Sequence, residues 1–221
     1  MPVHYIKRLI SGGEGQTLDF KFEISDYSKI ARTLAAFANT DGGKLLIGVK
    51  DNGAIAGVRS EEEYFMIEGA ASMYCQPPVE FRSTEWEVDG KKVLEIDVEK
   101  GLTSNPHYAP DKEGKWKVYI RQKDQNLLAD RLLLKVWKRQ SGERGTFIRF
   151  RENEKFLLEY LEQNGRITRS KFKKIADISN HRAETILVNF IMLDILGMEI
   201  TEKVTYFYLK EGYDQRIKDF E

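Results

Sequence analysis

The stretch from Thr17 to Ile24 alternates strictly between polar and apolar residues, which is the pattern of a β-strand with one buried face. A helical pattern follows directly, beginning at Asp26, a residue type that caps helices, and running to Ala38. Turn-forming residues at 39–43 end this helix, and Leu45 to Val49 predict a second short strand. This order of elements constrains the first part of the chain to a fold that mixes helices and strands.

Two further turn signals extend this pattern. Asp51-Asn52-Gly53 predicts a tight turn that returns through 54–58, and Asp89-Gly90 predicts a hairpin between 84–88 and 93–98. A further strand is predicted at 116–121. A helix is predicted at 127–137, with an apolar face made of Leu128, Leu132, Leu133 and Val136. We therefore expect an α+β fold with a mixed sheet.

The last third of the chain changes to helices followed by a hairpin. Helical stripes are predicted around 156–161, after Thr168 and from near Ser179 to Gly197, and 198–209 can form a two-stranded hairpin. Three helices and a β-hairpin are the parts of a winged helix-turn-helix. The glycines within 141–145 predict the boundary. We expect a domain at 1–140, a linker at 141–145 and a smaller winged-helix domain at 146–221.

Charge is balanced over the whole chain but not locally. The sequence holds 35 Lys and Arg and 35 Asp and Glu, so its formal net charge is zero and clustering decides whether a polyanion is bound. Residues 112–139 contain nine basic and three acidic side chains, and residues 166–182 contain six and one. The sequence thus predicts two basic regions.

Other features bear on the compartment. The single cysteine, Cys75, excludes an intramolecular disulfide and favours a reducing, cytoplasmic location. Residues 1–10 lack the apolar core of a signal peptide. The longest apolar stretch, 185–198, is interrupted by Asn189 and Asp194 and is too short to span a bilayer. No membrane passage is expected.

Three motifs occur in order in the first half of the chain: GEGQTLDFK at 13–21, AAFANTDGG at 35–43 and LIGVKD at 46–51. They are followed by Gly57-Val58, Asn105-Pro106-His107-Tyr108 and Val118-Tyr119-Ile120-Arg121. The ordered set resembles the Schlafen-type divergent Alba domain over roughly Gly12 to Arg139. This resemblance implies an Alba-like DNA-binding domain, a domain often fused to helix-turn-helix modules in bacterial regulators.

The resemblance also implies a candidate catalytic site, because animal Schlafen relatives include endoribonucleases that cut structured RNA with three carboxylates. Glu14, Asp19 and Asp51 fall on those positions, with Asp19 in place of the usual Glu. Such a set would hold Mg²⁺ or Mn²⁺, and Lys21 would neutralise the scissile phosphate. Alternatively, Glu14 lies in an exposed loop, Asp19 on the solvent side of its strand and Asp51 at the start of a hairpin turn.

A second candidate site is the turn that follows the first helix. Asn39, Thr40, Gly42 and Gly43 could cradle a phosphate with successive backbone N–H groups. The alternative is a helix C-cap, in which the two glycines supply left-handed backbone. No Walker-type sequence occurs, which argues against nucleotide hydrolysis.

The first basic region offers nucleic-acid contacts on the strand predicted at 116–121. Trp116 and Tyr119 could stack a base there, and Arg121 matches the Tyr-Ile-Arg strand of the resembled family. The cations expected to contact phosphates are Lys115, Lys117, Arg121 and Lys123. The alternative is a solvated charged face.

The second basic region surrounds the second and third helices of the expected winged helix. The residues expected to contact nucleic acid are Arg169, Lys171, Lys173, Lys174, Asn180, His181 and Arg182. The expected exposed face of the third helix is less basic, so protein contact or dimerisation stays open. That face carries Glu184, Thr185, Val188 and Asn189.

Three functions follow from these observations. The leading hypothesis is a DNA-binding transcriptional regulator that contacts DNA or RNA as a homodimer and is not an enzyme. The second is a metal-dependent endoribonuclease that uses Glu14, Asp19 and Asp51 with Mg²⁺ or Mn²⁺. The third is a protein-interaction module.

Overall fold

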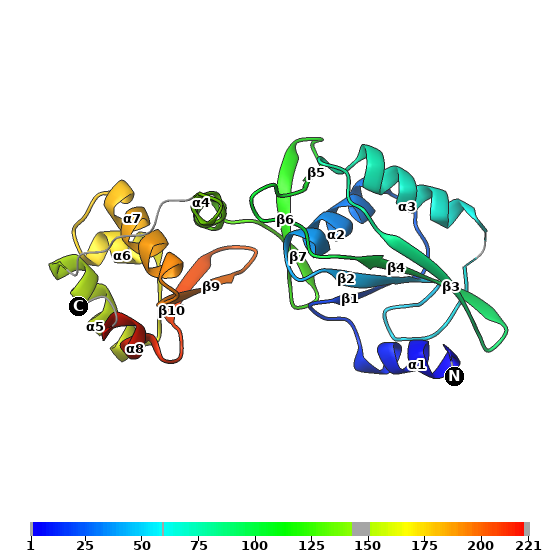
Figure 1. The fold of residues 1–221 in the computed structure, drawn as a ribbon, viewed down its shortest axis with the longest axis horizontal. Coiled ribbons are helices and arrows are strands. Elements are labelled where there is room, and N and C mark those ends of the chain that lie inside the picture. Colours follow the sequence, from blue (N-terminus) through cyan, green and yellow to red (C-terminus); the bar gives the residue numbers. More distant parts are fainter. Residues whose placement is uncertain (1, 59, 143–150, 219–221) are drawn as a thin grey trace. The chain divides into compact units, whose positions relative to one another are not determined.

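The computed structural model describes residues 2–58, 60–142 and 151–218. The chain divides into two compact units, residues 1–129 and 130–221 (Figure 1). The expected α+β class is confirmed. The division falls before the helix Arg131–Gln140, whereas the glycines predicted it at 141–145, a range that lies partly outside the described residues.

The N-terminal unit is built on a four-stranded mixed sheet. Across the sheet the strands are β1 (Leu18–Lys21), β2 (Gly43–Ile47), β4 (Lys91–Val98) and β3 (Arg82–Val88). β1 and β2 run parallel, with Leu18 opposite Lys44, and the other neighbours are antiparallel. The turn between β3 and β4 has positive φ at Asp89 (53°) and Gly90 (71°), which confirms the hairpin predicted there.

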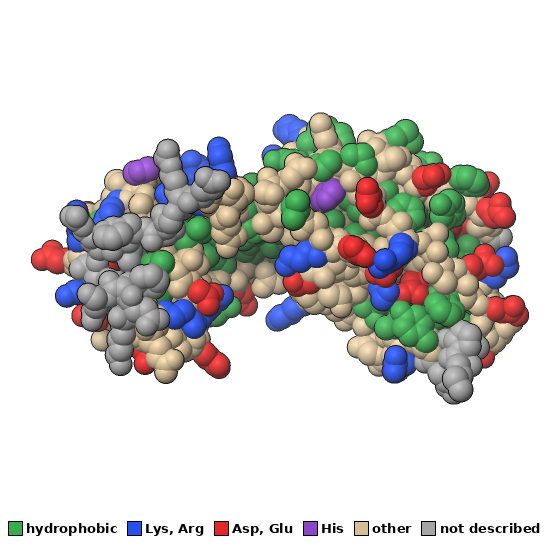
Figure 2. Space-filling view, viewed as in Figure 1, with side chains coloured by type: hydrophobic (Ala, Val, Ile, Leu, Met, Phe, Trp, Pro, Cys, Tyr) green, Lys and Arg blue, Asp and Glu red, His purple; other side chains and the backbone are tan. Residues whose placement is uncertain are grey.

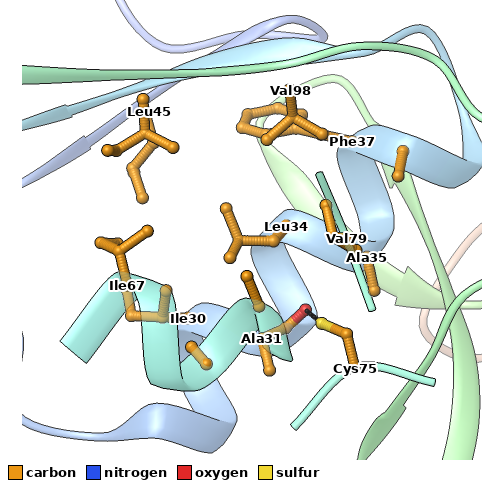
Figure 3. Close-up of a cluster of buried hydrophobic side chains, with 14 of the residues drawn as sticks. Ile30, Ala31, Leu34, Ala35, Phe37, Leu45, Ile67, Cys75, Val79 and Val98 are labelled. Atoms are coloured by element: carbon orange, nitrogen blue, oxygen red, sulfur yellow. Dashed lines mark hydrogen bonds between the residues drawn. The ribbon is translucent and has the colours of Figure 1, made fainter. Parts of the chain in front are cut away.

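Helices cover both faces of this sheet (Figure 1). On one face α1 (Pro2–Gly12) packs Ile6 into a buried cluster with Phe20 and Leu46. On the other face lie α2 (Tyr27–Asn39) and α3 (Glu62–Met73), whose cluster with the sheet is drawn in Figure 3. The predicted capping residue Asp26 begins α2 by accepting hydrogen bonds from the N–H groups of Ser28 and Lys29.

A second, antiparallel sheet lies against α2. Its strands are β5 (Tyr108–Pro110), β6 (Trp116–Gln122) and β7 (Gln125–Leu128), in that order. β7 occupies the start of the segment predicted as a helix at 127–137. The helix itself begins at Arg131, after the capping side chain of Asp130.

The C-terminal unit combines helices with a three-stranded antiparallel sheet of order β8-β10-β9. The elements are α4 (Arg131–Gln140), α5 (Glu152–Asn164), β8 (Arg166–Thr168), α6 (Arg169–Ile175), α7 (Asn180–Met192), β9 (Leu196–Ile200), β10 (Thr205–Leu209) and α8 (Tyr213–Lys218). The predicted hairpin is therefore present as β9 and β10. Leu157, Phe172, Ile186 and Phe207 lie at the centre of the core.

Within the described residues, no helix combines the length and the apolar character that crossing a bilayer requires.

Candidate nucleic-acid interface and the carboxylate site

Asp19 lies in the interior rather than on the solvent side of its strand. Its side chain is 6% exposed, and the guanidinium of Arg121, from β6, donates to its Oδ1 at 3.0 Å. The ammonium of Lys21 lies 2.8 Å from its other carboxylate oxygen. The interpretation of Asp19 as a solvent-facing residue is wrong because β6 brings a buried cation onto this face of β1.

Arg121 is an internal tie between β6 and the start of the chain. Its side chain is 1% exposed, and its guanidinium lies 5.2 Å from the centre of the Phe37 ring. Four acceptors surround it within 3.2 Å: Gly15 O, Leu18 O, Asp19 Oδ1 and Asn126 Oδ1. The prediction that Arg121 contacts nucleic acid is wrong, because its guanidinium is buried and already surrounded by protein acceptors.

Glu14 lies beside Asp19 and is also partly enclosed. Its Oε1 accepts a hydrogen bond from the Phe20 N–H at 2.8 Å. Burial raises the pKa of the Glu14 carboxyl, and the neighbouring Asp19 carboxylate raises it further. Two of the three predicted carboxylates are thus brought together by the β1 segment.

The third carboxylate, Asp51, is exposed in the turn between Val49 and Ile55. In the described part of the chain, no group of three or more His, Cys, Asp or Glu side chains is placed to hold a metal ion. Asp19 is already neutralised by Arg121 and Lys21. The donor set does not fit the Mg²⁺ or Mn²⁺ site that the resemblance implied, and Lys21 is engaged with Asp19 rather than free for a phosphate.

The turn after α2 is explained by the end of the helix and by packing. The N–H groups of Thr40 and Gly42 both donate to Phe37 O, which leaves neither for a phosphate. The Asn39 amide clamps the chain by donating to His107 O and Tyr119 O. These contacts support the C-cap interpretation over the phosphate cradle.

Close packing accounts for the two glycines of this turn. Gly42 has a φ of +72°, and a Cβ there would lie 2.7 Å from Val98 O. A Cβ at Gly43 would lie 2.5 Å from the Phe37 ring. Both positions therefore require glycine without any ligand.

The basic stretch on β6 is less open than its sequence predicted. Tyr119 is buried, so it cannot stack a base, whereas Trp116 is 44% exposed. Lys115 pairs with Glu113 at 2.6 Å. Lys117 and Lys123 are exposed, and neither forms an ion pair with another described residue. On the face of the N-terminal unit that Figure 2 shows, acidic and basic side chains lie next to one another.

In the C-terminal unit, two of the predicted contact residues are held by buried acids. Arg169 pairs with Glu184 at 2.7 Å, and Arg182 pairs with Glu154 at 2.6 Å. The remaining predicted contacts are exposed: Lys171, Lys173, Lys174, Asn180 and His181. Of these predicted contacts, the exposed cations therefore lie on α6, and Asn180 and His181 lie at the start of α7.

The face of α7 that was expected to be free is covered by α4. Val188 was expected on the exposed face, yet only 2% of it is exposed, and it lies in one buried cluster with Leu132 and Val136 of α4. Lys135 bonds the buried Glu184 carboxylate, and Arg139 donates to Asn189 Oδ1 at 2.7 Å. The expectation of a free central face on α7 is wrong, because the amphipathic helix at 131–140 belongs to this unit and packs against α7.

The sequence analysis did not place the cations of α4 in the C-terminal unit. Arg131, Lys135 and Lys138 recur at helical spacing, so they share one side of the helix. That spacing was the available signal. The sequence analysis assigned the predicted helix to the first domain and counted its cations in the basic region 112–139.

The model of the Schlafen, AlbA_2 family matches residues 14–130. A search of the curated proteins found no match. The solved structures that resemble the chain include the DIP2311 protein from Corynebacterium diphtheriae, with 17% identity and a TM-score of 0.45. The match covers 73% of this chain and 40% of that one, so it spans less than half of the DIP2311 protein.

Another similar structure is the N-terminal domain of a RecG-related protein from Nitrosomonas europaea. It is 23% identical with a TM-score of 0.40, and the match covers 55% of this chain and 87% of that domain.

Proposed function

The chain belongs to the Schlafen/AlbA_2 family, and we propose that it binds nucleic acid through exposed cations of its C-terminal unit. The observation that carries the proposal is the group of exposed side chains on α6 and at the start of α7. The described residues give Lys171, Lys173 and Lys174 no ion pair, whereas Arg169 and Arg182 each have one. Unpaired cations are available to replace the counterions of a polyanion.

The order of elements supports a winged helix as the frame of this surface. Helix α5, strand β8, helices α6 and α7 and the hairpin of β9 and β10 follow one another, and β8 adds a third strand to the hairpin. In a helix-turn-helix pair the start of the second helix lies nearest the base edges. On this proposal Asn180 and His181, both exposed in the first turn of α7, approach the bases.

The ion pairs of Arg169 and Arg182 support this surface indirectly. Glu184 and Glu154, their partners, are buried, so each arginine is held in place against its own unit. The fixed arginines order the first turns of α6 and α7, and the exposed lysines project from α6. Their role is positional, and the lysines supply the contacts.

Binding is tested with labelled duplex DNA, duplex RNA and single strands by fluorescence anisotropy. We expect affinity to fall steeply between about 50 and about 200 mM salt, because each phosphate contact releases about 0.9 counterion. The variant Lys171→Gln/Lys174→Gln should bind every sequence more weakly and with a smaller salt slope. Lys29→Gln/Lys91→Gln removes the same charge from the N-terminal unit and should bind as the wild type.

The proposal extends to a DNA-binding regulator that acts as a homodimer. A single start of α7 reaches few bases, and a two-fold pair would double the contacts and read two half-sites. Duplexes with two half-sites should then bind more tightly than duplexes with one. Equal affinity for both would remove the dimeric regulator and leave nucleic-acid binding standing.

A further inference from the structure

We propose that the outer side of α4 is a second phosphate-contacting surface, which we call the α4 ridge, made of Arg131, Lys135 and Lys138. Its ligand is the backbone of a nucleic-acid duplex, bound without regard to sequence. This inference rests on the proposed function and adds to it a helix that lies outside the three helices of the winged-helix frame.

The first support is a convergence of cations on one carboxylate. Glu184 is buried, and it is bonded by both Lys135 and Arg169. The hydrogen bond and charge of Lys135, together with the charges of Arg131 and Arg169, hold the pKa of Glu184 below its usual range. Three cations therefore share one acid, and the group keeps an excess of positive charge.

The second support is the spacing of the exposed side chains. Arg131 and Lys138 are seven residues apart, two turns along one side of α4, and about 10 Å apart along its axis. Neither forms an ion pair with any other described residue, and both are exposed. A duplex carries one charge per about 1.7 Å of axis, so a row of this length meets several phosphates.

The helix's own stability does not account for this row. Lys138, in the last turn, is favoured by the negative end of the helix dipole. Arg131 is in the first turn, where the dipole opposes a cation. A solvated helix face therefore explains one end of the row and not the other, whereas a polyanion partner explains both.

The third support is that α4 covers the centre of α7. Because Leu132 and Val136 pack α4 into the core of the C-terminal unit, the centre of α7 is closed to a groove of DNA. Elements that flank the start of α7 are left to approach the duplex. α4 and α6 both flank α7 and both bear exposed cations, so the ridge contributes backbone affinity that is equal for all sequences.

The test compares Arg131→Gln/Lys138→Gln with the wild type on several unrelated DNA duplexes, using anisotropy over a range of salt. Both side chains are exposed, so the variant should fold, which circular dichroism checks. We expect about tenfold weaker binding to every duplex and a salt slope smaller by about two, since about 0.9 counterion is released per phosphate. Lys29→Gln/Lys91→Gln is the matched control and should change neither quantity.

The outcomes separate this inference from the proposed function. If Lys171→Gln/Lys174→Gln binds weakly and the α4 variant binds as the wild type, the ridge is overturned and the proposed function stands. A loss that differs among duplexes would overturn backbone contact at the ridge. Ridge-dependent binding to anionic lipid vesicles, with duplex binding unchanged, would also overturn it. If the wild type binds no duplex, both proposals fall together.

Discussion

The guanidinium of Arg121 and the carboxylate of Asp19 form an ion pair of 3.0 Å in the interior of the N-terminal unit. The pair joins β6 to β1, two strands of different sheets that are far apart in the sequence. The same guanidinium also holds the backbone of the loop before β1 through Gly15 O. This loop carries Glu14, so the family's acidic segment is positioned from a strand a hundred residues later.

The buried pair makes Arg121 a determinant of stability. Arg121→Met would remove the donor of Gly15 O and the buried cation beside Asp19, and removing one partner of a buried pair costs about 3–5 kcal/mol of unfolding free energy. Arg82→Met is the control, because Arg82 pairs with Glu99 while 70% exposed, and such a change costs at most about 1 kcal/mol. Urea unfolding of both variants measures the difference. Equal losses would mean that Lys21 alone compensates Asp19.

The burial of Asp19 shows what could not be predicted from the sequence, namely which residues cover the polar face of β1. Alternation from Thr17 onward separates the two faces of a strand, and it correctly placed β1 and the apolar side of Phe20. It does not say what covers the polar side. The covering residue, Arg121, comes from a strand that no local pattern links to β1, so its basic side chain was interpreted as a surface contact.

A second prediction concerns the glycine turn after α2. Gly42→Ala would combine an unfavourable φ of +72° with a Cβ 2.7 Å from Val98 O. Gly114→Ala has a φ of +77° but no atom within 4 Å of the new Cβ, so it reports the backbone cost alone, about 1 to 2 kcal/mol. Thermal unfolding should show the larger loss for Gly42→Ala. An equal loss of stability in the two variants would mean that β4 moves away from the new methyl group at no cost in free energy.

In the C-terminal unit, local sequence signals predicted where helices begin better than they predicted which helices pack against one another. The caps at Thr168 and Ser179 placed the starts of α6 and α7 correctly, whereas α7 ends at Met192 and not at the predicted Gly197, which lies in β9. Periodicity also found the helix that includes Leu132 and Val136, but a stripe does not name the surface on which it packs. For that reason the centre of α7 was expected to be free, although Val188 is covered.

A third prediction uses the acid response of Glu184. Lys135 first, and then Arg131 and Arg169, hold the pKa of Glu184 below its usual range in the folded protein. The folded state then binds fewer protons than the unfolded state, so this contribution to stability is present above about pH 4.3, the ordinary value, and is lost as pH falls through the folded pKa. Glu184→Gln should lower the melting temperature at neutral pH and flatten its decline in acid.

The control for this acid response is Glu159→Gln, which removes an exposed carboxyl of α5 from the same unit. It should retain the wild-type decline of melting temperature between neutral pH and about pH 3, below the ordinary carboxyl values. A Glu184→Gln profile parallel to that of the wild type would show that the ion pairs around Glu184 contribute no pH-dependent stability.

The last prediction concerns the reactivity of Cys75. This thiol is buried in the α2 and α3 cluster of Figure 3, where it donates to Ala31 O at 3.5 Å. Burial raises its pKa to about 12, so at pH 8 roughly one thiol in ten thousand is a thiolate even before access is considered. We expect an aromatic disulfide reagent to label the native protein slowly, at the rate at which the cluster opens, and to label it at once in denaturant. Because Cys75 is the one cysteine of the sequence, each event is assigned without ambiguity.

The labelling rate can be tied to the packing that closes the site. Leu34 is fully buried in the same cluster, and Leu34→Ala should cost about 2–5 kcal/mol of unfolding free energy. Each 1.4 kcal/mol, about one factor of ten in the opening equilibrium, should raise the labelling rate by the same factor when closing is faster than reaction. Phe65→Ala removes an exposed side chain from α3 and should leave the rate unchanged. Rapid labelling of the native wild type would show instead that the thiol is reached without any opening of the cluster.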